Sequence, residues 1–210
     1  MTPFRHRARY TFAKVTENRQ SRNWIQCHIE MYEFFQGVPA ATIPDNEKTG
    51  VKRPCKYDPD LNPTYLDMAL HYDTAIIPTR PKKPRDKALV ENAVLNAQRW
   101  IIAALRNHVF FSVEQASEMV DEKLEEYNTR KYQRLDESRC QLFEQLDRPA
   151  LKPLPKLRYQ YGQWSSPKVN IDYHVEIDKH FYSVPYQLVG ERVEAHRTSL
   201  TVEIFFKGDL

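Results

Sequence analysis

The placement of proline constrains the fold of this 210-residue chain more than any other feature. Its 14 prolines all fall before residue 85 or after residue 148. Proline breaks helix interiors, so the interval between Arg85 and Arg148 can hold uninterrupted helices. The closely spaced Pro149, Pro153 and Pro155 then predict an extended linker over residues 148–168. We therefore expect a helical middle with mixed segments on either side.

The segment before the helical middle alternates between strand and helix patterns. Short apolar runs predict strands and helical spacing of apolar residues predicts helices, and such alternation is typical of an α/β layer. The expected strands are residues 9–15, 38–43 and 74–77, and the expected helices are residues 21–35, ended by Gly37, and 63–72.

The proline-free interval predicts two long helices. Asp86 is a plausible N-cap for a helix over residues 87–107, and Ser112 begins a near capping-box pattern for a helix over residues 112–128. The first helix carries one apolar stripe, formed by Val90, Val94, Ala97, Ile101, Ala104 and Leu105. The second carries an acidic face that we expect to be solvated, formed by Glu118, Asp121, Glu122 and Glu125.

The pattern changes to a period of two after residue 168. Apolar residues alternate strictly with polar ones from Val169 to Ile177, and the tripeptide Asp178-Lys-His then turns the chain into a second strand. Further alternation over residues 193–195 and 202–206 completes about four short strands. This spacing predicts a small antiparallel sheet or barrel.

Composition limits the class of protein. The net charge of +3 is too small to identify a nucleic-acid partner without local clustering. Cys27, Cys55 and Cys140 are odd in number and widely spaced, which favours a reducing, cytoplasmic compartment with free thiols. The sequence has no signal-peptide pattern, membrane-spanning run, phosphate-binding loop or serine-hydrolase motif, and its histidines lack zinc-site spacing, so we expect these classes to be excluded.

Two carboxylates stand where a metal-dependent phosphoryl-transfer site would need them. Asp45 follows an apolar run, and Glu91 lies near the start of the predicted helix over residues 87–107. Mg²⁺ prefers oxygen ligands, and carboxylates from separate elements can hold it beside a phosphate. Two plainer interpretations remain open: Asp45 as a turn residue before Asn46, and Glu91 as a surface partner of Lys87.

A basic segment leads directly to Glu91. Its five cations are Arg80, Lys82, Lys83, Arg85 and Lys87, with one acid among them. Such a cluster beside the expected metal site suits contact with DNA phosphates. The alternative is a solvated basic loop.

Consecutive motifs in this chain resemble the IstA-type transposases of insertion sequences. They are residues 37–39 (Gly-Val-Pro), 44–51 (Pro-Asp-Asn-Glu-Lys-Thr-Gly-Val), 61–65 (Leu-Asn-Pro-Thr-Tyr), 80–92 (Arg-Pro-Lys-Lys-Pro-Arg-Asp-Lys-Ala-Leu-Val-Glu-Asn), 99–101 (Arg-Trp-Ile), 143–155, 170–176 and 182–190. That family belongs to the DDE superfamily, together with phage Mu transposase and the retroviral integrases. The resemblance extends from about residue 10 to residue 208.

The resemblance implies an α/β RNase H-like integrase catalytic core, incomplete at its N-terminus, followed by a helical segment and a small antiparallel β-barrel. The expected boundaries are residues 1–110 for the core, 111–147 for the helical extension, 148–168 for the linker and 169–208 for the Mu-transposase-like barrel. Asp45 would be the second catalytic acid and Glu91 the third, both holding Mg²⁺ or Mn²⁺ for DNA cleavage and strand transfer.

Departures from the family pattern lead to two functional hypotheses. Glu47 and Leu89 stand where the family commonly has an apolar residue and a lysine, and the first family acid would precede Tyr10 on a strand that we do not find here. The first hypothesis is a DDE transposase that is inactive, and marginally folded over residues 1–150, as these 210 residues alone. The second is a non-catalytic fragment that binds DNA or a transposase subunit. The resemblance also implies an AAA+ helper ATPase, a homo-multimer and no membrane.

Overall fold

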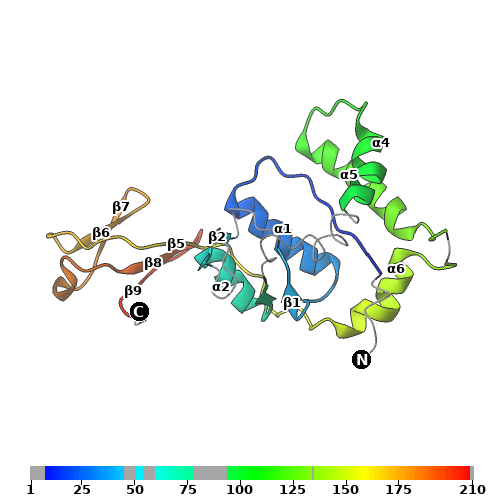
Figure 1. Ribbon diagram of the computed structural model, residues 1–210. Helices are drawn as coiled ribbons and strands as arrows, with labels where there is room; N and C mark the ends of the chain where they lie inside the picture. Colours follow the sequence, from blue (N-terminus) through cyan, green and yellow to red (C-terminus); the bar gives the residue numbers. More distant parts are fainter. Residues whose placement is uncertain (1–7, 45–50, 54–59, 78–93, 134, 209–210) are drawn as a thin grey trace.

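The computed structural model describes residues 8–44, 51–53, 60–77, 94–133 and 135–208. The short C-terminal strands lie at one end of the molecule, α1, α2 and β1 in the middle, and α4 to α6 at the other end (Figure 1). The helices are α1 (Ser21–Phe34), α2 (Pro63–His71), η1 (Gln98–Ile102), α4 (Ala103–Leu105), α5 (Val113–Thr129), α6 (Arg139–Leu142), η2 (Phe143–Asp147), η3 (Arg148–Ala150) and η4 (Tyr186–Leu188). The strands are β1 (Ala41–Thr42), β2 (Val51–Arg53), β3 (Asp60–Leu61), β4 (Ala75–Ile76), β5 (Gln163–Ser165), β6 (His174–Ile177), β7 (His180–Ser183), β8 (Glu194–Arg197) and β9 (Val202–Phe205).

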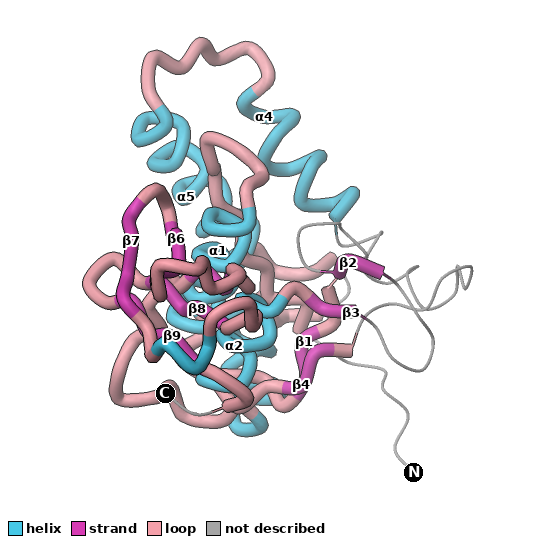
Figure 2. Tube along the Cα trace, turned by 90° about the vertical axis from the view of Figure 1, so that its left-hand side faces the viewer, coloured by secondary structure: helices cyan, strands magenta, loops and turns pink. Residues whose placement is uncertain are grey.

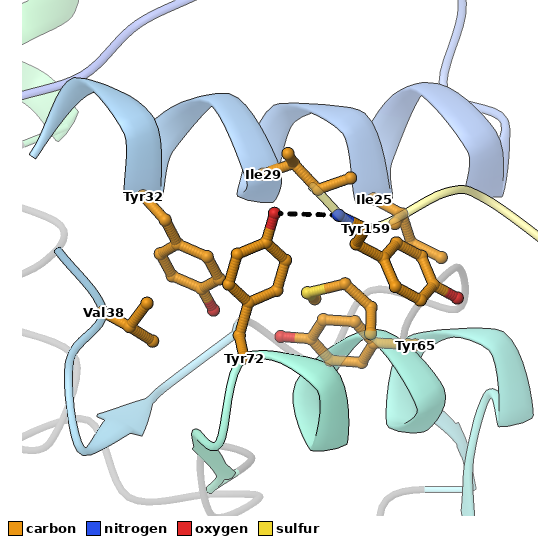
Figure 3. Close-up of a cluster of buried hydrophobic side chains, with 8 residues drawn as sticks. Ile25, Ile29, Tyr32, Val38, Tyr65, Tyr72 and Tyr159 are labelled. Atoms are coloured by element: carbon orange, nitrogen blue, oxygen red, sulfur yellow. Dashed lines mark hydrogen bonds between the residues drawn. The ribbon is translucent and has the colours of Figure 1, made fainter. Parts of the chain in front are cut away.

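The region of α1, α2 and β1, called the middle region below, is held together by a cluster of aromatic and aliphatic side chains between α1 and α2 (Figure 3). α1 contributes Ile25, Ile29 and Tyr32, which recur on one face of the helix because four and three residues make about one turn. α2 contributes Tyr65 and Met68 by the same spacing. The cluster is completed by Val38, Tyr72 and Tyr159. The two helices predicted in this part of the sequence are therefore confirmed, within one residue at their C-terminal ends.

The segment 9–15, predicted as a strand, is not one in the structure. The side chain of Asn128 replaces a neighbouring strand: its Oδ1 accepts from the Thr11 N–H at 3.1 Å, and its Nδ2 donates to the Thr11 carbonyl at 2.7 Å. Tyr10 stacks on Phe34 and Phe143 with ring centroids 5.1 and 4.6 Å apart. The prediction was wrong because the backbone N–H and C=O of Thr11, inside this segment, bond a helix side chain and not a strand, which apolar alternation does not reveal.

The helices predicted for the proline-free interval are present, although the first of them is irregular. The structure describes that helix from Val94 onwards, and five of its residues, Gln98–Ile102, form a π-helical stretch. Ile101 and Leu105 are buried as the stripe predicted, whereas Val94 and Ala104 are exposed. A π-helical turn contains one more residue than an α-helical turn, so it rotates the apolar stripe partly out of register.

The second long helix, α5, begins as predicted. Ser112 is its N-cap, and the Ser112 Oγ accepts from the Gln115 N–H at 3.2 Å. The four acidic residues assigned to its outer face are all exposed. No helix in the described ranges combines the length and apolar composition needed to cross a membrane.

The segment expected to be a linker is extended but packed. Val38 and Lys152 form a bridge through two N–H to carbonyl hydrogen bonds of 2.8 Å each. Tyr159 is only 8% exposed, because its ring fills the core cluster between α1 and α2. The strand β5 also falls within this segment. Residues 150–165 therefore belong to the packing of both neighbouring regions.

The C-terminal part forms two small antiparallel sheets. One is the β6–β7 hairpin (Figure 2), and the other has the strand order β5-β8-β9. The two share a core of Val169, Val175, Ile177, Val193 and Ala195. Among the described residues the strands do not close into a barrel, so the structure confirms small antiparallel sheets and leaves the expected β-barrel unconfirmed.

The hairpin itself starts later than the alternation predicted. Ile171 and Tyr173 are 87% and 52% exposed, because residues 170–173 form a turn in which the Tyr173 N–H donates to the Asn170 carbonyl at 3.1 Å. The predicted turn at Asp178 and Lys179 is confirmed, and both residues have left-handed backbone angles (φ 51° and 65°). Two consecutive left-handed residues match the twist of a two-residue hairpin loop.

Candidate functional site

The predicted site residues all lie outside the described residues. They are the two carboxylates and the five cations of the basic segment, namely Asp45, Glu91, Arg80, Lys82, Lys83, Arg85 and Lys87. The structure does describe the strands from which two of these segments continue. These two strands therefore indicate where the site would lie.

The two strands are β1 and β4, which form a parallel pair. Ala41 is paired with Ala75 and Thr42 with Ile76, and the Ile77 N–H donates to the Thr42 carbonyl at 3.0 Å. Strands that run parallel have their carboxyl ends at the same edge of the sheet. The chain therefore leaves both strands at one edge.

Sequence separation connects this edge to the predicted site. Asp45 follows Thr42 by three residues, and Arg80 follows Ile76 by four. The acid and the first cation of the basic segment thus follow strands that end side by side. In open α/β sheets this carboxyl edge is where ligands commonly bind.

A buried row of hydroxyl groups fixes the strand pair to α1. The Tyr32 hydroxyl lies 2.8 Å from Thr42 Oγ1, which lies 3.2 Å from Thr74 Oγ1. Burial raises the pKa of Tyr32, partly offset by its hydroxyl partners, so this group stays protonated. Sequence reasoning missed the row, although two threonines in apolar strand segments next to a helix tyrosine were the available signal.

A second polar cluster joins α2 to the C-terminal sheet. The Tyr159 hydroxyl donates to Asp67 Oδ2 at 2.7 Å, and the same oxygen lies 3.8 Å from His196 Nε2 on β8. On its other side, His196 Nδ1 lies 3.2 Å from Glu203 Oε2. Desolvation raises the pKa of Tyr159, and the nearby Asp67 carboxylate raises it further, so the tyrosine is the hydrogen-bond donor.

This cluster borders an open cleft of about 1280 Å³ between the middle region and β8. The His196 ring stacks on Trp164 with centroids 4.6 Å apart. Glycine at residue 162 leaves room for this ring, because a Cβ atom there would lie 1.9 Å from His196 Nε2 and would force the ring to shift. The arrangement fixes β8 against α2.

Within the described ranges, no three His, Cys, Asp or Glu side chains gather as they would around a metal ion. Cys27 and Cys140 are free thiols, while Cys55 lies outside the described residues. The metal ligands predicted from the sequence are two of the undescribed residues, so their geometry stays a prediction.

Comparison with known proteins adds an independent line of evidence. A family model for the C-terminal domain of Mu transposase matches residues 154–210. A putative transposase of Sinorhizobium fredii is 46% identical over 93% of this chain and 38% of its own length. A putative transposase for insertion sequence IS408, from Burkholderia multivorans, is 41% identical over 95% of this chain and 38% of its own length.

Among solved structures, the catalytic core domain of BIV integrase is similar with a TM-score of 0.49 and 9% identity, over 66% of this chain and 80% of that one. The chain spans well under half the length of these two curated relatives.

Proposed function

This chain belongs to the family of insertion-sequence transposases, and on that premise we propose that it forms part of an enzyme that cleaves and joins DNA during transposition. The observation that carries the proposal is the shared carboxyl edge of β1 and β4. From that edge the chain continues into Asp45 on one side and the basic segment on the other. The α1 and α2 helices packed on this parallel pair support an RNase H-like core.

Asp45 and Glu91 would hold a divalent cation in this proposal. The donor set fits Mg²⁺ or Mn²⁺, because both residues offer hard carboxylate oxygens and one of them follows the carboxyl edge of a parallel strand pair. When bound, such a metal supplies positive charge at the reacting phosphate. The hydroxyl row of Tyr32, Thr42 and Thr74 would keep β1 in place while ligands bind beyond its end.

The basic segment would bind the DNA backbone. Arg80, Lys82, Lys83, Arg85 and Lys87 supply charge for phosphates, and phosphate contacts position DNA without selecting its sequence. We place the enzyme in the cytoplasm, where its DNA substrate is found. An AAA+ helper ATPase and a homo-multimer are proposed on family resemblance.

On the family resemblance, these 210 residues tested by themselves would supply the second and third of the three acids that a DDE mechanism uses. We therefore expect the 210-residue polypeptide to bind DNA but not to join it. Joining by this polypeptide that Glu91→Gln abolishes would contradict that expectation.

The decisive experiment uses a transposase of the relatives' full length that includes these 210 residues. Purified protein is incubated with labelled transposon-end DNA and Mg²⁺, and joined products are quantified. Even outer-shell partners of metal ligands change activity by about 10–100-fold, so Asp45→Asn and Glu91→Gln should each reduce joining by more than about a hundredfold. Glu118→Gln removes the same charge from the exposed face of α5 and should leave joining unchanged. Joining that survives Glu91→Gln would refute the assigned role of Glu91.

A further inference from the structure

A basic, aromatic pocket lies away from the β1–β4 edge. It has a volume of about 490 Å³ and is bordered by the N-terminal segment, the helix of Trp100, the end of α5 and the start of α6. The described residues that line it include four cations and no carboxylate. The cations are Arg9, Arg130, Lys131 and Arg139. A concave site with this charge attracts anions.

Arg139 is the most rigidly held of these cations. Its guanidinium lies 3.8 Å from the centre of the Tyr127 ring and 4.7 Å from that of Tyr132. One terminal nitrogen donates to the Tyr127 carbonyl at 2.9 Å. The Nε atom is buried and has no acceptor among the described residues. A buried N–H without an acceptor is costly, so this arginine leaves one donor of its guanidinium unsatisfied among the described residues.

Arg9 lies close enough to Tyr132 to act on its hydroxyl. Burial raises the pKa of Tyr132, while the charges of Arg139 and Arg9 oppose that rise. The Tyr132 hydroxyl donates to the Ala8 carbonyl at 2.9 Å, which holds the N-terminal segment against the pocket. Arg9 itself has a left-handed backbone angle (φ 52°), a strained conformation for arginine. Arg9 and Arg139 therefore both line the pocket beside Tyr132.

Arg130 and Lys131 form the outer wall of the pocket. The Arg130 guanidinium lies 4.0 Å from the centre of the Trp100 ring, which remains 48% exposed. Lys131 pairs with Asp136 at 2.6 Å, but Asp136 is 94% exposed, so water screens this pair strongly. Both cations and part of an aromatic side chain are thus exposed beside the pocket, which suits a ligand larger than a single ion.

We propose that this pocket binds a backbone phosphate of DNA, with Trp100 against the adjoining sugar or base. The inference rests on the proposed function, because it takes DNA as the source of the phosphate. Arginines that hold a phosphate beside an exposed aromatic ring are the combination used for single-stranded nucleic acid.

The test measures DNA binding by the 210-residue chain with fluorescence anisotropy. Arg130→Gln with Lys131→Gln removes two exposed cations of the pocket, while Arg106→Gln with Lys156→Gln removes two exposed cations elsewhere. We expect the pocket variant to raise the Kd for single-stranded DNA about three- to tenfold and to lower the slope of log K against log salt by about 1. The matched variant should change the Kd less than twofold.

Two further measurements separate the possible outcomes. Trp100→Leu should weaken the binding of single-stranded DNA more than the binding of duplex DNA, since stacking needs an unpaired base. Circular dichroism melting must show that every variant is folded. Equal weakening by the pocket and matched variants would overturn the proposal. So would a pocket variant that binds DNA normally but loses thermal stabilisation by inorganic phosphate, since the pocket would then take a free anion.

The outcome is independent of catalysis. Pocket-dependent DNA binding can hold even if Glu91→Gln leaves joining intact, which would refute only the catalytic assignment. Conversely, Glu91-dependent joining in the longer transposase with a pocket variant that binds DNA normally would refute only the pocket.

Discussion

The middle region and the C-terminal sheets are stabilised in different ways. The core between α1 and α2 contains four tyrosines, whose hydroxyl groups need hydrogen-bond partners when they are buried. The core beneath the C-terminal strands consists of valine, isoleucine and alanine, which carry no such requirement. One core therefore depends on polar geometry and the other mainly on apolar contact.

The two regions also differ in the sequence distance of their contacts. The Tyr159 hydroxyl bonds Asp67 across 92 residues, and Lys152 bridges to Val38. The strands β5 to β9 find their partners within residues 163–205. The middle region is thus completed by the distant segment 150–160, whereas the C-terminal sheets form from neighbouring chain. This contrast indicates that the two regions should respond differently to the same kind of change.

The largest expected effect is Tyr159→Ala. The substitution empties a buried ring position in the middle core and should lower the free energy of unfolding by about 3–5 kcal/mol. Urea denaturation measures the change in the free energy of unfolding of the whole chain. Hydrogen exchange should show a loss of protection in α1 but not in β6 and β7. Tyr186→Ala, at a position 69% exposed, is the control. Equal loss of protection in both regions would remove the contrast between them.

The second largest expected effect is a loss of stability of the middle region at acid pH. Burial lowers the pKa of His28, and the bond from its Nδ1 to the Trp24 carbonyl only partly offsets this. The unfolded chain therefore binds more protons than the native one as the pH falls below about 6.5, the ordinary histidine pKa. The contribution of His28 to stability is fully present above that pH and is lost as the pH falls toward its folded value.

Urea denaturation at about pH 7.5 and about pH 5.5 measures this effect. His28→Phe should reduce the difference between the two values, while substitution of the exposed His180 by glutamine should preserve it. A pH dependence unchanged in His28→Phe would assign the acid response to another group.

The smallest expected effect belongs to the C-terminal sheets. Lys179 has φ 65° in the hairpin turn, and glycine adopts this angle without steric cost. Lys179→Gly should therefore stabilise the β6–β7 hairpin by about 0.5–1 kcal/mol, after the entropy cost of glycine is subtracted. Asp178→Gly should gain less, because it loses the ion pair with Arg197. Hydrogen exchange of the hairpin amides distinguishes the two, and destabilisation by Lys179→Gly would contradict the prediction.

Local patterns in the sequence predicted local structure well. The helical spacing of Ile25, Ile29 and Tyr32, the cap at Ser112 and the turn at Asp178 each involve residues within one or two turns of one another. Wherever the partner was distant, prediction failed or was incomplete. The segment 9–15 hydrogen-bonds the side chain of Asn128 and does not pair with a strand. The segment predicted to be a linker contributes Tyr159 to the core between α1 and α2.

The same division applies to function. The consecutive motifs along the sequence, by themselves, determined the transposase family and named Asp45, Glu91 and the basic segment, since family motifs are read residue by residue. Only the tertiary structure decided that β1 and β4 run parallel and end at one edge, and that Arg9, Arg130 and Arg139 converge around Trp100 and Tyr132. The physical reason is that strand direction and the meeting of distant charges depend on how the whole chain packs, and no local pattern contains that information.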